Sequence, residues 1–258
     1  MPFVEVGELK THYALTGGKG PLLMFSNSLG TDFSMWDAQV EELQQHFRIL
    51  RYDTRGHGKS SVTLGEYTGE QLGRDVLGVL DALRLERVHF CGLSMGGSIG
   101  IWLGIHAPER LHRLILSNTA ARIGTKEAWN ARIATVCKDG MKFVAAAVVE
   151  RWFTPEFRAS CKEQVTRTQK MLENSPLEGY AGCCAAVRDM DERETIAGIK
   201  TPTLVIYGGR DPVIPIPDAQ FLADRITGAE RIELNAAHLS NVEQAGAFTE
   251  AVSHFLSR

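Results

Sequence analysis

Two patterns of apolar residues alternate along this chain. Short runs such as residues 21–25 are apolar throughout, as strands buried on both faces of a sheet should be. Longer stretches such as residues 68–85 repeat apolar residues at helical spacing, which places Leu72, Val76 and Leu83 on one face. The first pattern predicts strands at residues 21–25, 48–52, 87–91, 111–116, 203–207 and 230–234. The second predicts helices at residues 35–47, 68–85, 98–103 and 217–226 and around Phe248, Val252 and Phe255.

This alternation of strands and helices indicates the arrangement of the sheet. Parallel strands joined by right-handed crossovers give such an order, so we predict a doubly wound α/β sheet. Two short segments with alternating polarity, residues 4–6 and 12–15, are expected to add an antiparallel edge. In sheets of this kind ligands bind beyond the carboxyl ends of the strands, so we expect the catalytic side chains to lie in the loops that follow those ends.

The alternation stops after Asn118 and resumes at Thr203. The segment between them contains no convincing strand pattern. Its apolar spacing predicts helices at residues 126–138, 141–151, 156–172 and 176–187. The simplest organisation is one α/β core made of residues 1–120 and 191–258, with residues 121–190 inserted into it as a helical lid.

The composition and charge of the chain indicate which kinds of protein it can be, and they agree with one α/β core that carries a lid. The chain has 258 residues, of which 44% are hydrophobic and 23% charged, as in an ordinary domain with a large core. A net charge of −3 without a basic cluster gives no reason to expect nucleic acid or an anionic membrane as partner. The N-terminal segment has neither a signal-peptide pattern nor a membrane-spanning run. Five cysteines without a C-x-x-C pair suit the reduced thiols of a cytoplasmic protein.

The segment 92–96, which reads Gly-Leu-Ser-Met-Gly, stands between a strand-like run and a helix-like run. A serine at such a turn is held in a strained backbone conformation, which exposes its hydroxyl next to a helix N-terminus that favours negative charge. Gly92 and Gly96 leave room for the turn because they carry no Cβ. Since a glycine-rich turn can contain this motif by chance, Ser94 is a candidate nucleophile only if it has partners.

A serine nucleophile needs a base within hydrogen-bond reach, and the base needs an acid to orient it. Asp211 comes directly after the predicted strand at residues 203–207, and His238 follows the strand ending at Leu234. Asp211 precedes a proline and would also suit a turn, and His238 could be a surface histidine. The loop at residues 117–119 carries no carboxylate, so Asp211 has no obvious rival.

Two further reactive side chains lie close to these motifs. His57, in the glycine-rich segment 53–60, could act as a second base, but a structural hydrogen-bonding role is favoured. Cys91 precedes the serine turn and could be a redox-sensitive thiol, although a small buried hydrophobe is favoured at the end of an apolar strand.

The order Ser94, Asp211, His238 is that of α/β-hydrolases, which the chain resembles over its whole length. More narrowly, it is similar to the 3-oxoadipate enol-lactonases of bacterial aromatic-acid breakdown. The matching segments are residues 26–31, 51–58, 90–97, 180–189 and 237–241. The glycine-rich loop and the serine turn are common to many subfamilies. The narrower matches are Asn-Ser at 27–28, where many such hydrolases have His-Gly, Cys-Cys-Ala-Ala at 183–186, and His-Leu-Ser-Asn at 238–241.

The resemblance implies an α/β-hydrolase fold, a mostly parallel doubly wound sheet with an inserted helical lid, and no metal or organic cofactor. The substrate would be an anionic small molecule, a five-membered enol-lactone with an acetate side chain. Ser94 would attack the ring carbonyl while His238 takes its proton, and the backbone N–H groups of Leu29 and Met95 would hold the oxyanion. His238 would then activate water to release 3-oxoadipate.

An anionic substrate calls for a cationic side chain in the pocket. Arg188, at the return from lid to core, is the first choice, although it could instead pair with the acidic residues beside it. Arg132, in the first predicted lid helix, is the second. Trp129 and Trp152 are expected to line the apolar part of the pocket, unless they pack between lid helices.

Other functions remain open at this point. A general carboxylesterase, a perhydrolase similar to cofactor-free haloperoxidases and a C–C bond hydrolase would use the same three side chains. A serine nucleophile argues against haloalkane dehalogenases and epoxide hydrolases, which use a carboxylate there. A small-molecule receptor derived from a hydrolase is the non-enzymatic alternative. The sequence does not indicate an oligomeric state.

Overall fold

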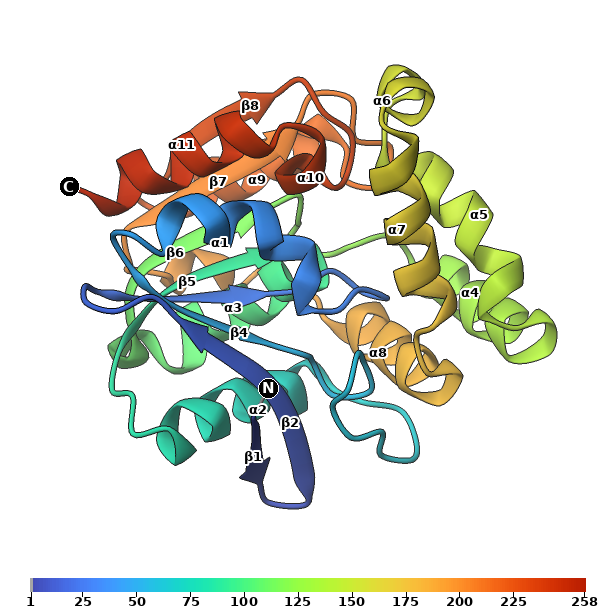
Figure 1. The fold of residues 1–258 in the computed structure, drawn as a ribbon, viewed down its shortest axis with the longest axis horizontal. Coiled ribbons are helices and arrows are strands. Elements are labelled where there is room, and N and C mark those ends of the chain that lie inside the picture. Colours follow the sequence, from blue (N-terminus) through green and yellow to red (C-terminus); the bar gives the residue numbers. More distant parts are fainter. Residues whose placement is uncertain (1) are drawn as a thin grey trace.

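An eight-stranded sheet forms the centre of the computed structural model, which describes residues 2–258 (Figure 1). Its strand order is β1-β2-β4-β3-β5-β6-β7-β8. The strands are β1 (Phe3–Val6), β2 (Leu9–Thr16), β3 (Leu22–Ser26), β4 (Arg48–Tyr52), β5 (Val88–Leu93), β6 (Leu111–Ser117), β7 (Thr203–Gly208) and β8 (Glu230–Leu234). β2 pairs antiparallel with β1 and with β4, and all other pairs are parallel, which confirms the predicted doubly wound sheet with an antiparallel edge.

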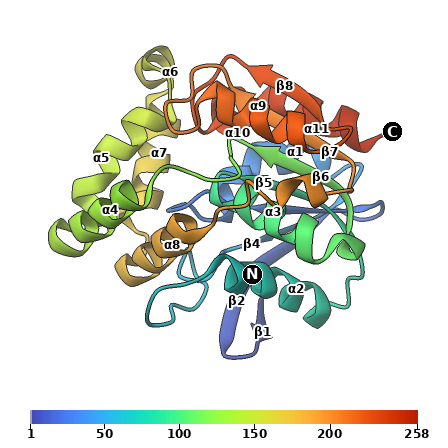
Figure 2. The same cartoon turned by 180° about the vertical axis from the view of Figure 1, so that it is seen from behind.

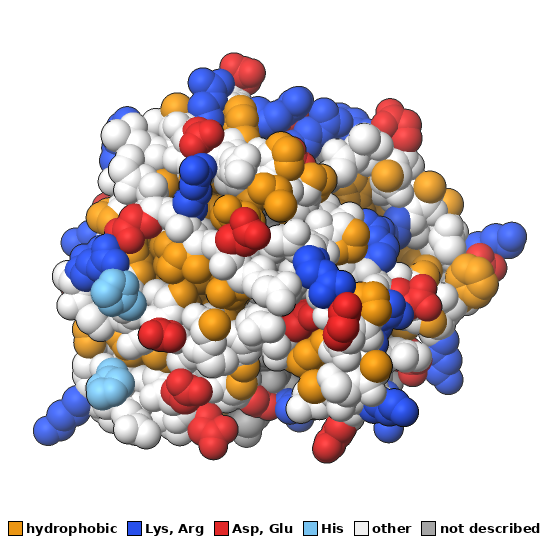
Figure 3. Space-filling model, turned by 90° about the horizontal axis from the view of Figure 1, so that it is seen from above, with side chains coloured by type: hydrophobic (Ala, Val, Ile, Leu, Met, Phe, Trp, Pro, Cys, Tyr) orange, Lys and Arg blue, Asp and Glu red, His pale blue; other side chains and the backbone are white. Residues whose placement is uncertain are grey.

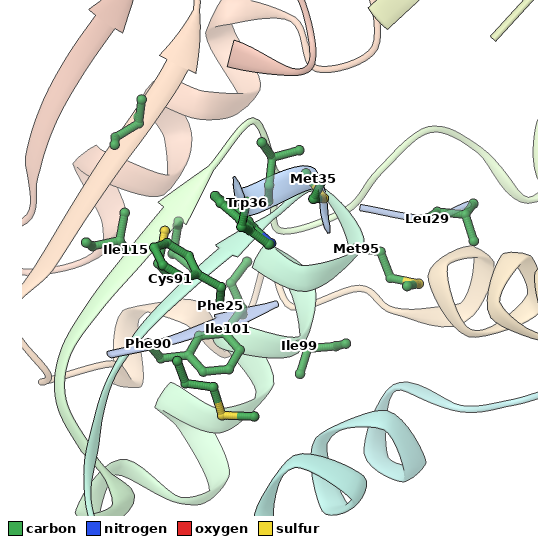
Figure 4. Close-up of a cluster of buried hydrophobic side chains, with 14 of the residues drawn as sticks. Phe25, Leu29, Met35, Trp36, Phe90, Cys91, Met95, Ile99, Ile101 and Ile115 are labelled. Atoms are coloured by element: carbon green, nitrogen blue, oxygen red, sulfur yellow. The ribbon is translucent and has the colours of Figure 1, made fainter. Parts of the chain in front are cut away.

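The apolar runs form the inner strands. Every residue of β3, β5 and β7 is buried, because helices cover both faces of the sheet. One face carries α1 (Asp37–Leu43) and α11 (Ala245–Leu256), and the other carries α2 (Gly69–Ala82), α3 (Met95–His106) and α9 (Ile216–Arg225), as Figures 1 and 2 show. Figure 4 shows Phe25, Phe90 and Ile101 in the core between strands and α3.

The predicted helix at residues 35–47 is shorter in the structure. A 3₁₀ turn, η1 (Phe33–Trp36), opens the segment, and the side chain of Asp32 caps it by accepting from the Ser34 N–H. α1 then ends at Leu43. The amides of His46 and Phe47 turn back to the Leu43 carbonyl, which leads the chain directly into β4.

Within the described chain, five α-helices lie between β6 and β7, and they stand together beyond one end of the sheet (Figure 1). They are α4 (Lys126–Asp139), α5 (Met141–Trp152), α6 (Pro155–Ser160), α7 (Lys162–Glu173) and α8 (Leu177–Asp189). The single helix expected at residues 156–172 is wrong. Cys161, at φ −113° and ψ +50°, leaves the helical region and ends α6, after which α7 folds back along α5. We interpret residues 121–190 as a lid inserted into the core.

The remaining elements are short. They are η2 (Pro108–Arg110), η3 (Ile196–Gly198) and α10 (Ser240–Glu243). On the face drawn in Figure 3, basic and acidic side chains are interspersed with apolar ones. No helix within residues 2–258 has the length and apolar character needed to cross a bilayer.

Candidate active site

Ser94 occupies the sharp turn between β5 and α3. Its backbone has φ +57° and ψ −117°, a conformation that residues with a Cβ rarely adopt. A Cβ on Gly92 would lie 2.1 Å from the Gly96 carbonyl oxygen, and one on Gly96 would lie 2.2 Å from the carbonyl oxygen of Ser26. The glycines on either side therefore make the turn possible by letting backbone approach backbone.

The structure brings Ser94, His238 and Asp211 into one hydrogen-bonded chain. His238 Nε2 lies 2.9 Å from Ser94 Oγ, and His238 Nδ1 lies 2.8 Å from Asp211 Oδ2. All three residues are buried at the carboxyl ends of β5, β7 and β8. The arrangement can hold the imidazole with its proton on Nδ1, which leaves Nε2 free to accept the serine proton.

The Asp211 carboxylate is fully satisfied by donors. Oδ1 accepts the N–H groups of Val213 and Ile214, at 2.7 and 3.1 Å. Burial by itself would raise the pKa of this carboxyl, but the facing His238 and the hydrogen bonds it accepts hold the pKa below its ordinary value. Asp211 therefore stays ionised and orients His238.

Asn118 is a site residue that the sequence analysis missed. It directly follows β6 and has φ +43°, and its Nδ2 donates to Asp211 Oδ2 at 2.9 Å. Its Oδ1 in turn accepts from Ser240 Oγ at 2.5 Å and from Ser117 Oγ at 2.9 Å. Its position directly after a core strand is the signal for it in the sequence. An amide at this position acts as a donor to the acid, not as an acid itself.

A pocket lies between the strand ends and the lid and encloses about 430 Å³, part of it open to solvent. Both proposed oxyanion donors, Leu29 and Met95, line it beside Ser94 and His238. Neither backbone N–H donates to an acceptor elsewhere in residues 2–258. Met95 is the first residue of α3, so its N–H has no acceptor within the helix and points outward from the N-terminal end of α3.

Three of the four residues predicted to bind substrate line this pocket, namely Trp129, Arg132 and Trp152. The ring of Trp152 lies 6.5 Å from that of His238. Arg132 Nε donates to the Tyr180 hydroxyl at 2.7 Å, and its guanidinium lies 5.7 Å from the centre of the Trp129 ring. No carboxylate within residues 2–258 forms an ion pair with Arg132, so its charge is available to a ligand.

Arg188, the first choice for the cation, does not line the pocket. Its guanidinium binds Glu66 and Asp189, both at the surface, and the Asn130 side chain. Val187 faces the pocket instead. Successive residues of an α-helix differ by about 100° around the axis, so Arg188 points away from the strand ends. A cation not singled out from the sequence, Arg151, lines the pocket at the end of α5, beside the predicted Trp152.

His57 and Cys91 take the roles that the sequence favoured. His57 is fully buried outside the pocket, where Nε2 accepts the N–H of Gly30 at 2.8 Å, so it is not a second base. Cys91 lies inside the core (Figure 4), where burial raises the pKa of its thiol. Among residues 2–258, no group of three or more His, Cys, Asp or Glu side chains is arranged to hold a metal ion.

The chain has relatives with known structures and named activities. The family described as the alpha/beta hydrolase fold matches residues 21–146. The 3-oxoadipate enol-lactonase 2 of Acinetobacter baylyi is 44% identical over 97% of this chain and 94% of its own length. The crystal structure of the enol-lactonase from Burkholderia xenovorans LB400 has a TM-score of 0.98 at 44% identity and covers 100% of both chains. A malate-bound thermophilic esterase from Thermogutta terrifontis has a TM-score of 0.93 at 27% identity, over 99% of this chain and 97% of that one.

Proposed function

The chain belongs to the 3-oxoadipate enol-lactonases of the alpha/beta hydrolase family, and from this we propose that it opens 3-oxoadipate enol-lactone to 3-oxoadipate through an acyl-enzyme. The observation that carries the proposal is the chain of hydrogen bonds from Ser94 through His238 to Asp211, beside a lid pocket with an unpaired arginine. The serine supplies the nucleophile, and the arginine matches the carboxylate of the substrate.

The first half of the reaction forms the acyl-enzyme. Ser94 Oγ gives its proton to His238 Nε2 and bonds to the ring carbonyl carbon, whose oxygen takes the negative charge. The N–H groups of Leu29 and Met95 hold this oxyanion, and the N-terminus of α3 adds its positive dipole end. Each such donor typically contributes about 100- to 1,000-fold to kcat.

Collapse of the tetrahedral intermediate breaks the bond between the carbonyl carbon and the ring oxygen. The ring oxygen takes the proton from His238 and leaves as an enol. It departs more readily than an alkoxide oxygen, because the negative charge that develops on it is delocalised over the neighbouring C=C bond. His238 then takes a proton from water, which attacks the acyl carbon and frees Ser94. The released enol becomes the ketone of 3-oxoadipate, so the reaction consumes only water.

Substrate orientation depends on the lid side of the pocket. Arg132 is held by Tyr180 and Trp129, which leaves its terminal nitrogens for the acetate side chain of the lactone. Trp152 packs near His238 and supplies an apolar wall that excludes water from the acyl-enzyme except at the attack position. Arg151 is the second cation at this pocket.

The test of this function is a spectrophotometric assay with authentic enol-lactone. The wild type should open the ring, and Ser94→Ala should lose about 1,000-fold or more in kcat with unchanged thermal unfolding. A Ser94→Ala protein that keeps turnover within about tenfold of wild type contradicts the acyl-enzyme route. Ser98→Ala, on the next turn of the same helix, should keep most of the activity and serves as the control.

General carboxylesterase activity is the second candidate, favoured by the structural likeness to the Thermogutta esterase. Comparison of kcat/KM for enol-lactone and for p-nitrophenyl acetate separates the two. A lactonase should prefer the anionic lactone, whereas an esterase should favour the neutral ester. We also propose a cytoplasmic location, supported by five cysteines that form no disulfide within residues 2–258.

A further inference from the structure

Three successive peptide groups of the loop after β3 are held by hydrogen bonds from different parts of the chain. The Ser28 carbonyl accepts the Thr31 hydroxyl at 2.8 Å and the Thr31 N–H at 3.2 Å. The Gly30 N–H donates to His57 Nε2 at 2.8 Å. The Gly30 carbonyl accepts the hydroxyl of Ser175, a lid residue, at 2.9 Å. The loop that carries the proposed oxyanion donor is therefore fixed from the core and from the lid.

These bonds determine where the Leu29 N–H points. In a trans peptide the carbonyl and the N–H face opposite ways, so a Ser28 carbonyl turned to Thr31 aims the Leu29 N–H away from Thr31. The next peptide, between Leu29 and Gly30, is held by His57 alone among side chains. The two peptides meet at the Leu29 Cα, so loss of the bond to His57 loosens the loop on one side of Leu29 and shifts its N–H through this shared atom.

The state of His57 follows from its neighbours. A backbone N–H only donates, so Nε2 must be unprotonated to accept the Gly30 N–H. Nδ1 then carries the proton and donates to the Arg55 carbonyl at 3.2 Å. The imidazole is fully buried, and burial lowers its pKa to about 4, which agrees with a neutral ring. His57 is therefore a fixed acceptor rather than an acid or base.

The loop packs tightly against the lid at Gly30. Gly30 has φ +82°, and a Cβ there would lie 2.2 Å from Leu172 Cδ1 and 3.1 Å from the ring of Tyr180. Both side chains belong to the lid, and Tyr180 also accepts the hydrogen bond from Arg132. The pocket arginine, the lid and the oxyanion loop thus share one packed contact.

We propose that His57 is a positioning residue of the lactonase reaction, whose neutral Nε2 holds the Gly30 peptide so that the Leu29 N–H meets the developing oxyanion. The proposal rests on the proposed function. It assigns to the glycine-rich segment 53–60 a part in transition-state binding, although none of its side chains lines the pocket.

Two substitutions test the roles of the two ring nitrogens of His57 separately. His57→Gln keeps an acceptor near the place of Nε2, whereas His57→Asn keeps a donor near Nδ1 and loses the acceptor. We expect His57→Asn to lower kcat for the enol-lactone by about 10- to 100-fold with KM within about threefold, because a displaced donor weakens only the transition state. His57→Gln should stay within about threefold of wild type in kcat. Equal kcat values for the two variants, or a loss confined to KM, overturn the proposal.

Ser175→Ala provides a second variant that leaves the buried ring in place. It releases the other side of Gly30 and should lower kcat by about three- to tenfold, and an unchanged kcat contradicts the clamp. Cys183→Ala is the matched control, because Cys183 Sγ lies 3.8 Å from His57 Nδ1 but does not touch Gly30. It should keep wild-type kcat if Nε2 is the atom that matters.

Affinity for phenylboronic acid tests His57 independently of the lactone. The boronic acid forms a tetrahedral adduct with Ser94 whose oxygen occupies the oxyanion site, so His57→Asn should weaken its Kd in parallel with kcat. Unchanged Kd for His57→Asn rejects the positioning role. A wild-type protein that binds the boronic acid but does not open the enol-lactone rejects the proposed function instead, and the two failures are thereby distinguished.

Discussion

At the scale of residues, the site depends on neutral hydrogen-bonding groups as much as on charged groups. Asn118 donates to Asp211 at 2.9 Å, and the hydroxyls of Ser117 and Ser240 orient its amide. His57 serves the oxyanion loop in the same way, through a nitrogen that only accepts. Asn118 carries no charge and belongs to no motif, but without it the buried Asp211 carboxylate would lose part of its orientation.

The choice between the two lid arginines gives a prediction at this scale. Arg132→Met should raise KM for the enol-lactone by about 10- to 100-fold, because a hydrogen bond to a charged group is worth about 1.5–3 kcal/mol. The KM for neutral p-nitrophenyl acetate should change by less than about threefold. Arg188→Met is the matched control and should leave both KM values unchanged, because its charge already pairs with Glu66 and Asp189 at the surface. A larger KM effect from Arg188→Met would restore the assignment made from the sequence.

At the scale of elements, the first turn of α8 rests directly on the glycine-rich loop of the core. A Cβ on Gly179 would lie 2.1 Å from the carbonyl oxygen of Gly56 and 2.4 Å from its Cα. Gly56 itself has φ +73°. This contact of backbone on backbone fixes the distance between the lid and the loop of residues 27–31 that carries Leu29, because Tyr180 and Leu172 of the lid contact Gly30 in that loop.

Gly179→Ala tests that contact against helix propensity. Alanine in place of glycine ordinarily stabilises a helix by about 1 kcal/mol. Here the new methyl group has no space, so we expect a loss of about 1–3 kcal/mol in the free energy of unfolding, measured by denaturant or heat. Gly198→Ala, at a position with no atom within 4 Å of the added Cβ, is the control and should not destabilise. Equal stability of the two variants would show that the lid can shift without cost.

At the scale of the whole molecule, folding buries histidines as well as apolar side chains. His57 and His89 are both buried, and burial lowers the pKa of each from an ordinary 6.5 to about 4. The neighbouring His112 and Arg113 add to the effect at His89. In the unfolded chain both rings take up a proton near pH 6.5. Below this pH the unfolded state binds more protons than the native state, so the free energy of unfolding decreases.

The predicted result is a stability that is complete above about pH 6.5 and falls as the pH is lowered toward 4. Both rings contribute to this fall, because the unfolded state binds the proton at a higher pH than the native state does. His89→Leu removes one of these titrations together with an Nδ1 that has no hydrogen-bond partner, so its melting temperature should fall less between pH 6.5 and 4. If the melting temperature depends on pH identically in this variant and in the wild type, burial of a neutral His89 does not contribute to the loss of stability in acid.

The sequence by itself determined the alternation of strands and helices, the serine turn and the loops that carry Asp211 and His238. These features depend on local energetics: apolar periodicity, glycine at tight turns and reactive side chains at strand ends. The parallel arrangement of the sheet then brings three distant loops to one edge, which is why Ser94, His238 and Asp211 meet in one chain of hydrogen bonds.

Tertiary structure alone decided which side chains those residues meet. The break at Cys161, the presence of Arg132 rather than Arg188 at the pocket, the donor Asn118 and the acceptor His57 depend on how helices and loops from separate parts of the chain pack together. Successive residues of an α-helix lie about 100° apart around its axis. The position of an arginine along the chain therefore does not say whether its side chain faces the pocket or the surface, because this depends on how the helix packs against its neighbours. Local sequence sets the elements, and packing between them selects the partners of each polar group.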